Sequence, residues 1–116
     1  MAIPSGSGTE VLKRATGVAH DAAVDALTCA TLHIYTIISI IVCNDNTSDC
    51  AFYMQIHDGS TDRRVVRQPV LPANSTFIWN DKIVLHPGDV LKIEEYGNVS
   101  NLPYWISYID QDWTTP

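Results

Sequence analysis

Histidine side chains are the first candidates for metal binding or acid–base chemistry in this sequence. The four histidines never occur as HxH or HxxxH pairs, the spacings at which two imidazoles share one face of a strand or helix; they are His20, His33, His57 and His86. His33 and His86 flank apolar runs, where a histidine at a strand end is the simpler interpretation. The histidines therefore predict no metal site.

Two acidic pairs leave calcium as an alternative, because carboxylates and loop carbonyls are the oxygen ligands that this ion takes. They are Asp45 with Asp49 and Asp110 with Asp112. A solvated turn over residues 44–49 and a fraying polar tail after residue 109 explain the same residues equally well. No metal is predicted.

The cysteines match no paired CxxC zinc pattern, and three of them cannot all pair within one chain; they are Cys29, Cys43 and Cys50. Free, buried or half-buried thiols are the expected state. Cys43 and Cys50 could nonetheless face each other across the base of the 44–49 loop, which would permit a disulfide in an oxidising medium.

Nucleophilic catalysis needs a serine or cysteine held beside a base and an oxyanion site, and no GxSxG elbow occurs. Gly6-Ser7-Gly8 is not followed by Lys-Ser or Lys-Thr, so it is no phosphate-binding loop. The sequence predicts no catalytic residue, no cofactor and no enzyme.

The tryptophans, with Tyr104 and Tyr108, are the remaining candidates for binding, as a stacking platform for sugars or bases. Trp79 and Trp105 fall in predicted strands, where packing in or beside the core is the default. Trp113 stands in a polar tail and needs a partner surface to bury its ring.

The composition of the chain is that of one packed domain. It has 116 residues, 46% of them hydrophobic and 17% charged. The net charge of −6 and the scattered Lys and Arg residues disfavour nucleic acid as a partner. Residues 26–43 carry no charge but are rich in Thr, Ile and Val, which favours strands over a membrane helix. The N-terminus has no secretory signal pattern, so synthesis in the cytoplasm is expected.

Short apolar runs separated by turn residues about every eight to twelve positions are typical of a sandwich or barrel. We predict an all-β fold, an antiparallel, jelly-roll-like β-sandwich over residues 10–113. Residues 1–9, with Pro4, Gly6 and Gly8, are expected to be a flexible N-terminal arm, and residues 114–116 end a short tail. The expected strands are 10–15, 33–43, 50–57, 63–68, 76–79, 82–85, 90–96 and 104–109.

Alternation along these runs predicts which side chains face the core. In 33–43 the inward set is Ile34, Thr36, Ile38, Ile40 and Val42; in 50–57 it is Phe52, Met54 and Ile56. The arginine-rich run 63–68 is typical of a sheet edge. Residues 17–26 have weak helical composition without a cap, and Asn80-Asp81 is expected to reverse the chain tightly.

Four stretches carry a resemblance to a known group of proteins: LPANSTFIWNDKIVL (71–85), HPGDVL (86–91), IPSGSGTEVLKR near the start and WISYIDQDW near the end. In these the chain resembles small β-sandwich virion structural proteins of tailed bacteriophages, especially phages of cyanobacteria and other aquatic bacteria. The resemblance implies a virion component without an active site. The expected role is a capsid decoration (cement) protein on the head surface, bound to the major capsid protein or other virion subunits. It implies a homo-oligomer, a trimer or dimer.

Two alternatives stay open at this stage: a neck or tail adaptor or fibre-attachment protein on the same fold, and a small carbohydrate-binding module. The expected protein contacts come from the arm, the first strand and the aromatic tail. These contact residues are Ile3, Pro4, Val11, Leu12 and Trp113.

Overall fold

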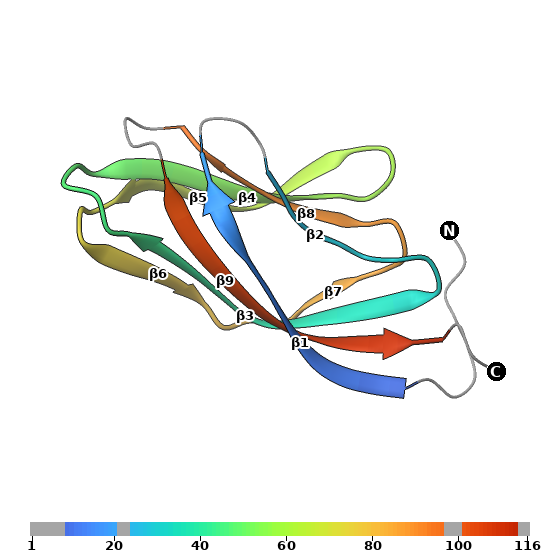
Figure 1. Cartoon of the computed structure of the whole chain (residues 1–116). Coiled ribbons are helices and arrows are strands. Elements are labelled where there is room, and N and C mark those ends of the chain that lie inside the picture. The colour runs from blue at the N-terminus through green and yellow to red at the C-terminus, as the bar shows by residue number, and fades with distance from the viewer. Residues whose placement is uncertain (1–8, 21–23, 97–100, 114–116) are drawn as a thin grey trace.

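A computed structural model describes residues 9–20, 24–96 and 101–113 of the chain. Within this part the chain forms nine β-strands and no helix (Figure 1). The described residues accordingly include no helix that could span a membrane. The strands are β1 (Thr9–Ala19), β2 (Val24–Thr28), β3 (His33–Asn44), β4 (Cys50–His57), β5 (Asp62–Leu71), β6 (Ser75–Trp79), β7 (Ile83–Leu85), β8 (Val90–Glu95) and β9 (Leu102–Asp112).

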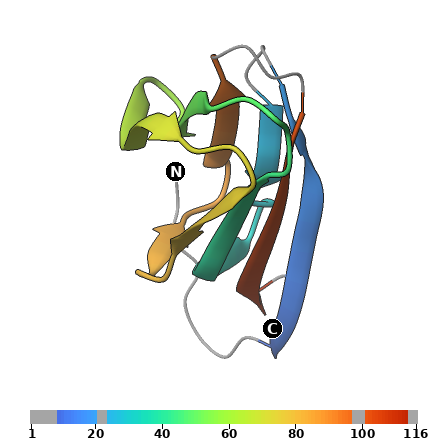
Figure 2. The same cartoon turned by 90° about the vertical axis from the view of Figure 1, so that its left-hand side faces the viewer.

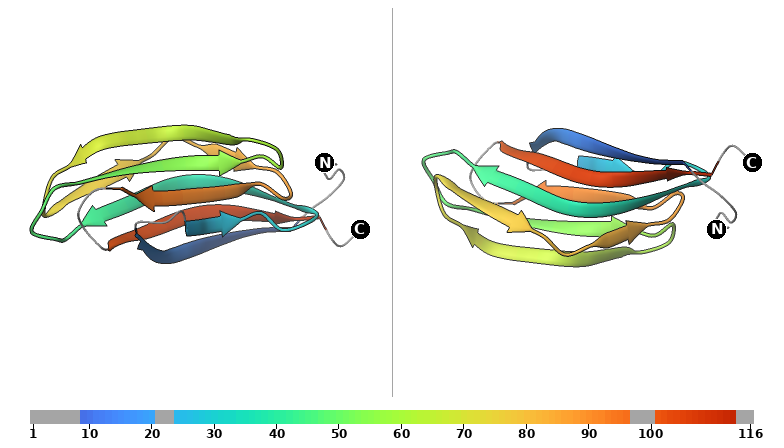
Figure 3. Two further views of the ribbon diagram at one scale, coloured as in Figure 1. Left: turned by 90° about the horizontal axis from the view of Figure 1, so that it is seen from above. Right: turned by 90° about the horizontal axis from the view of Figure 1, so that it is seen from below.

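The strands form two antiparallel sheets that pack face to face (Figures 2 and 3). The front sheet has the order β1-β9-β3-β6, with β7 also pairing with β3, and the back sheet has the order β2-β8-β4-β5. Strands from the two ends of the chain thus alternate in both sheets, as expected when one long hairpin is rolled up into a jelly roll. The predicted fold class is confirmed.

The core lies between the sheets and is made by alternate residues of their central strands. The fully buried side chains include Phe52, Met54, Leu91, Ile93, Ile40, Val42 and Ile106. The predicted core positions Phe52 and Met54 are confirmed, and Ile56 packs partly buried against them. Each such side chain contributes roughly 1.5–3 kcal/mol by leaving water.

The inward face of β3 changes over along the strand. Ile40 and Val42 are buried as predicted, whereas in the first half the buried residues are Tyr35 and Ile37. The pairing with β9 shifts between Ile37 and Ser39, so one extra residue is inserted there. Such a β-bulge inverts the alternation. The prediction of Ile34, Thr36 and Ile38 as core residues was therefore wrong.

Asn80 and Asp81 do not reverse the chain, contrary to the prediction. Both β6 and β7 pair antiparallel with β3, β6 with residues 40–44 and β7 with residues 35–37. The two strands therefore run in the same direction along one edge, interrupted by residues 80–82. The interruption lies beside the bulge of β3, where continuous pairing fails.

The N- and C-terminal strands extend further than predicted. Residues 17–19 belong to β1 and 24–26 to β2, so the helical interpretation of 17–26 was wrong for its described residues. Edge pairing with β9 and β8 overrides the weak helical composition. Residues 110–112, assigned above to a polar tail, continue β9, because Asp110 pairs with both Val11 and Tyr35.

Candidate binding surface

The outer face of the front sheet carries two rows of mainly apolar side chains that cross the strands. The first row follows the pairing register of β1, β9, β3 and β6 and consists of Thr16, Trp105, Ile41 and Ile78. The second row consists of Leu12, Ile109, Thr36 and Val84. Arg14, Ser107 and Ser39 form a row between them. We call these three rows the front face.

The front face is apolar and open to solvent. Exposed fractions are 71% for Leu12, 56% for Ile78, 52% for Val84 and 42% for Trp105. Within the three rows the one charged side chain is Arg14. A contiguous group of exposed large apolar side chains, rather than scattered single ones, marks an interaction site.

A shallow depression lies at the β1 side of the front face. Its volume is about 400 Å³, and it is lined by Leu12, Lys13, Arg14, Trp105 and Ser107. The Arg14 guanidinium stacks over the Trp105 indole, 4.8 Å from the ring centroid. This cation–π contact holds the two side chains together. The depression suits a partner's side chain or the flat face of a sugar ring.

The outer face of the back sheet has the opposite character. Tyr53 lies across from Glu94 and Arg67, and Gln55 lies across from Lys92 and Arg64. Arg64 stacks on the Tyr53 ring at 4.0 Å, and the Tyr53 hydroxyl donates a hydrogen bond to Glu94. The back face is thus a network of charged and polar groups, and the candidate apolar binding surface is on the front.

An ionic cluster fixes the start of β1 against β9 and β3. Asp110 is buried and lies 2.8 Å from the Lys13 ammonium and 2.6 Å from Nδ1 of His33. The hydrogen bond to Asp110 raises the pKa of Lys13. Three strands therefore meet at one carboxylate, which positions Leu12 and Arg14 on the other side of β1.

Residues of both acidic pairs considered for calcium have protein partners. Asp110 holds Lys13 and His33, and Asp112 lies 3.6 Å from Nε2 of His33. Asp49 accepts a hydrogen bond from the Ala73 amide at 2.9 Å. Among the described residues, no three His, Cys, Asp or Glu side chains gather as a metal site would require.

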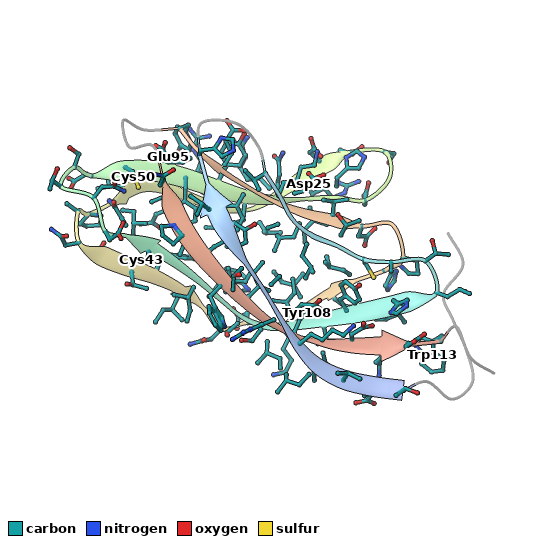
Figure 4. The ribbon with its side chains drawn as sticks, viewed as in Figure 1. Asp25, Cys43, Cys50, Glu95, Tyr108 and Trp113 are labelled. Atoms are coloured by element: carbon teal, nitrogen blue, oxygen red, sulfur yellow. The ribbon has the colours of Figure 1, made fainter. Side chains whose placement is uncertain are left out.

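The three cysteines are free thiols in this structure. Cys43 lies on β3 and points to the outer side of the front sheet, whereas Cys50 lies on β4 and points into the core (Figure 4). They do not face each other across the loop. Burial raises the pKa of Cys29 and of Cys50 to about 11, so neither is a ready nucleophile at neutral pH.

The predicted contact residues are spread over the molecule. Val11 and Leu12 are both exposed on β1, but they point to opposite sides, and Leu12 alone belongs to the front face. Trp113 directly follows β9; its ring is partly buried and its amide donates a hydrogen bond to the Leu32 carbonyl at 2.9 Å. Ile3 and Pro4, with the rest of the expected arm up to residue 8, lie outside the described residues.

Sequence reasoning missed most of the front face. Trp105 was expected in or beside the core, yet it is exposed, because its strand buries Tyr104, Ile106 and Tyr108 instead. The alternation of the stretch YWISYI contains this signal, since only one of its two faces can enter the core. Trp79 is partly buried against the core, as expected.

Comparison with known proteins concerns the fold. No protein-family model and no curated protein sequence matches the chain. A solved structure described as Bacillus endospore appendages, a novel family of disulfide-linked pili, is similar with a TM-score of 0.58 and 15% identity. The match covers 98% of this chain and 97% of that chain. At this identity the similarity shows a shared fold.

Two capsid structures are more distant matches. One is a pentameric capsid protein isolated from metagenomic phage sequences, with a TM-score of 0.46, 10% identity and coverage of 85% of this chain. This chain spans 61% of that protein's length. The other is a chain of the Cyanophage Pam1 capsid asymmetric unit, with a TM-score of 0.44, 9% identity and coverage of 97% and 92%.

Proposed function

We propose that this chain is a non-catalytic structural protein of a virion, a capsid decoration protein that lies on the outer surface of the major capsid protein shell. The observation that carries the proposal is the front face, with Leu12, Trp105, Ile78 and Val84 exposed together. A rigid sheet that presents apolar side chains binds another surface without first having to order itself.

The distribution of charge on the molecule agrees with this role. The back face carries the charged and polar side chains that a surface turned to water needs. The net charge of −6 keeps the protein from the packaged nucleic acid. Many copies on a symmetric shell would add modest individual contacts through avidity.

Copy number in purified particles tests this proposal. Hundreds of copies per particle, measured by quantitative mass spectrometry against the major capsid protein, are expected for a head decoration protein. About six or twelve copies would instead favour a neck or tail adaptor, since those machines are ringed. Absence from purified particles would contradict a virion role altogether.

A carbohydrate-binding module is the second candidate, and the Trp105 depression favours it. An exposed indole beside Arg14 and Ser107 offers one stacking face and two kinds of hydrogen-bond donor, the combination that sugar rings need. Binding on a glycan array that Trp105→Ala abolishes would support this candidate. A silent array at high protein concentration would remove it.

A further inference from the structure

The first half of β1 is a long edge that the described residues leave uncovered. β1 pairs with β9 on one side, and residues 9–14 are all exposed (Figure 1). The other edges are less suited to pairing: β5 carries three arginines, β2 has five residues and a register shift, and β6 and β7 are interrupted. An open edge presents unpaired backbone N–H and C=O groups to another strand.

The sequence of this half-strand is complementary to itself. Glu10, Leu12 and Arg14 lie two residues apart and so point to the same side of the sheet, the front. If two copies pair antiparallel with Leu12 opposite Leu12, Glu10 of each copy faces Arg14 of the other. Two ion pairs then flank one apolar contact, and both are of the cross-strand type that stabilises sheets.

Few other registers are compatible with one continuous sheet. Residues that lie opposite each other in an antiparallel pair point to the same face of the sheet. A two-fold axis between the two copies must therefore place one residue opposite the same residue of the other copy. Centring on Lys13 or Arg14 sets like charges against each other, and centring on Val11 sets Glu10 against Leu12. The Leu12 register alone pairs opposite charges.

We propose that two copies of this chain associate through their β1 edges, antiparallel and with Leu12 at the two-fold axis. The front sheets then form one continuous sheet, and the two front faces become one larger surface with Leu12 at its centre. This association concerns the isolated protein and does not require a virion role.

Charge reversal tests the register directly. Glu10→Arg places Arg against Arg, and Arg14→Glu places Glu against Glu, so each variant should weaken the dimer roughly tenfold or more in light-scattering chromatography. An equal mixture of the two variants should restore a heterodimer, and the double variant E10R/R14E should restore a homodimer. Lys82→Glu, an exposed charge away from β1, is the matched control and should leave the dimer unchanged.

A cross-link gives an independent readout. In a Cys43→Ser background, Leu12→Cys should oxidise rapidly to a disulfide-linked dimer, because the two Cα atoms at the axis lie within disulfide reach. Thr16→Cys should not form this disulfide, since residue 16 lies about 26 Å from residue 16 of the other copy in this register. A wild-type chain that stays monomeric at millimolar concentration, or a dimer that both single reversals leave intact, would overturn the proposal.

Discussion

Gly17 is a position where one methyl group decides the packing of β1 on β9. It pairs with Tyr104, and a Cβ added at Gly17 would lie 2.7 Å from the ring carbon Cζ of Tyr104. The Tyr104 ring is buried and has little room to withdraw. We expect Gly17→Ala to lower the free energy of unfolding by about 1–3 kcal/mol, measured by urea denaturation.

The neighbouring Thr16 is the control for this substitution. Its side chain is exposed on the front face, so Thr16→Ala should change stability by no more than about 0.5 kcal/mol. A Gly17→Ala protein as stable as the wild type would show that the Tyr104 ring can move aside and that β1 is not packed tightly on β9.

The thiols should differ sharply in reactivity. Cys29 and Cys50 are buried and have a pKa of about 11, whereas Cys43 is half-buried on the outer side of β3. Iodoacetamide at pH 8 should therefore label Cys43 in the folded protein, and the other two only after unfolding, as read by peptide mass spectrometry. Rapid labelling of folded Cys43→Ser protein would contradict the assignment.

The same burial makes stability depend on pH at the alkaline end. The folded pKa of Cys29 and Cys50 lies above the ordinary 9.0, so each thiol stabilises the folded state, and this contribution is fully present below pH 9. As the pH rises from 9 toward about 11, unfolded thiols ionise first and this contribution is lost. The melting temperature should fall over that range, and fall less in Cys50→Ala.

Among the elements, those set by local patterns were predictable from sequence. The strand 50–57 alternates without a break, and the Pro87-Gly88-Asp89 turn needs Gly88, whose φ is +90°. The inward face of β3 was not predictable in the first half of the strand, up to Ile38, because HIYTIISIIVC is apolar on both faces and nothing local marks the bulge. The continuation of β6 into β7 also depends on β3, a partner distant in sequence.

Deletion of residues 1–8 tests whether the N-terminal segment binds a neighbouring subunit. Strand β1 begins at Thr9, which pairs with Asp112, so removing residues 1–8 leaves the whole of β1 in place. We expect the melting temperature to stay almost unchanged and incorporation into particles to be lost, if this segment clamps a neighbour. Ile3→Ser with Pro4→Ser, at full length, should reproduce the loss. A deletion variant that fails to fold would contradict the clamp.

At the scale of the whole molecule, the two faces of the sandwich differ in a way that only the register reveals. In the sequence, Ile41 lies 64 residues before Trp105 and 37 residues before Ile78. In the structure these three residues form one row across three strands. Sequence reasoning named Leu12 as a contact residue, which stays a prediction, but placed Trp105 near the core and Thr36 inside it. The fold class followed from periodicity, whereas the candidate binding surface required knowing which strands are neighbours.

Hydroxyl-radical footprinting of the free protein and of particles that contain it tests the central claim, that the front face is the surface that binds. Oxidation of Leu12, Ile78 and Trp105 should fall several-fold on assembly, while Tyr96, exposed near the back sheet, should be oxidised equally in both states. Unchanged oxidation of Trp105 and Ile78 in the particle, together with protection of Tyr96, would contradict the account.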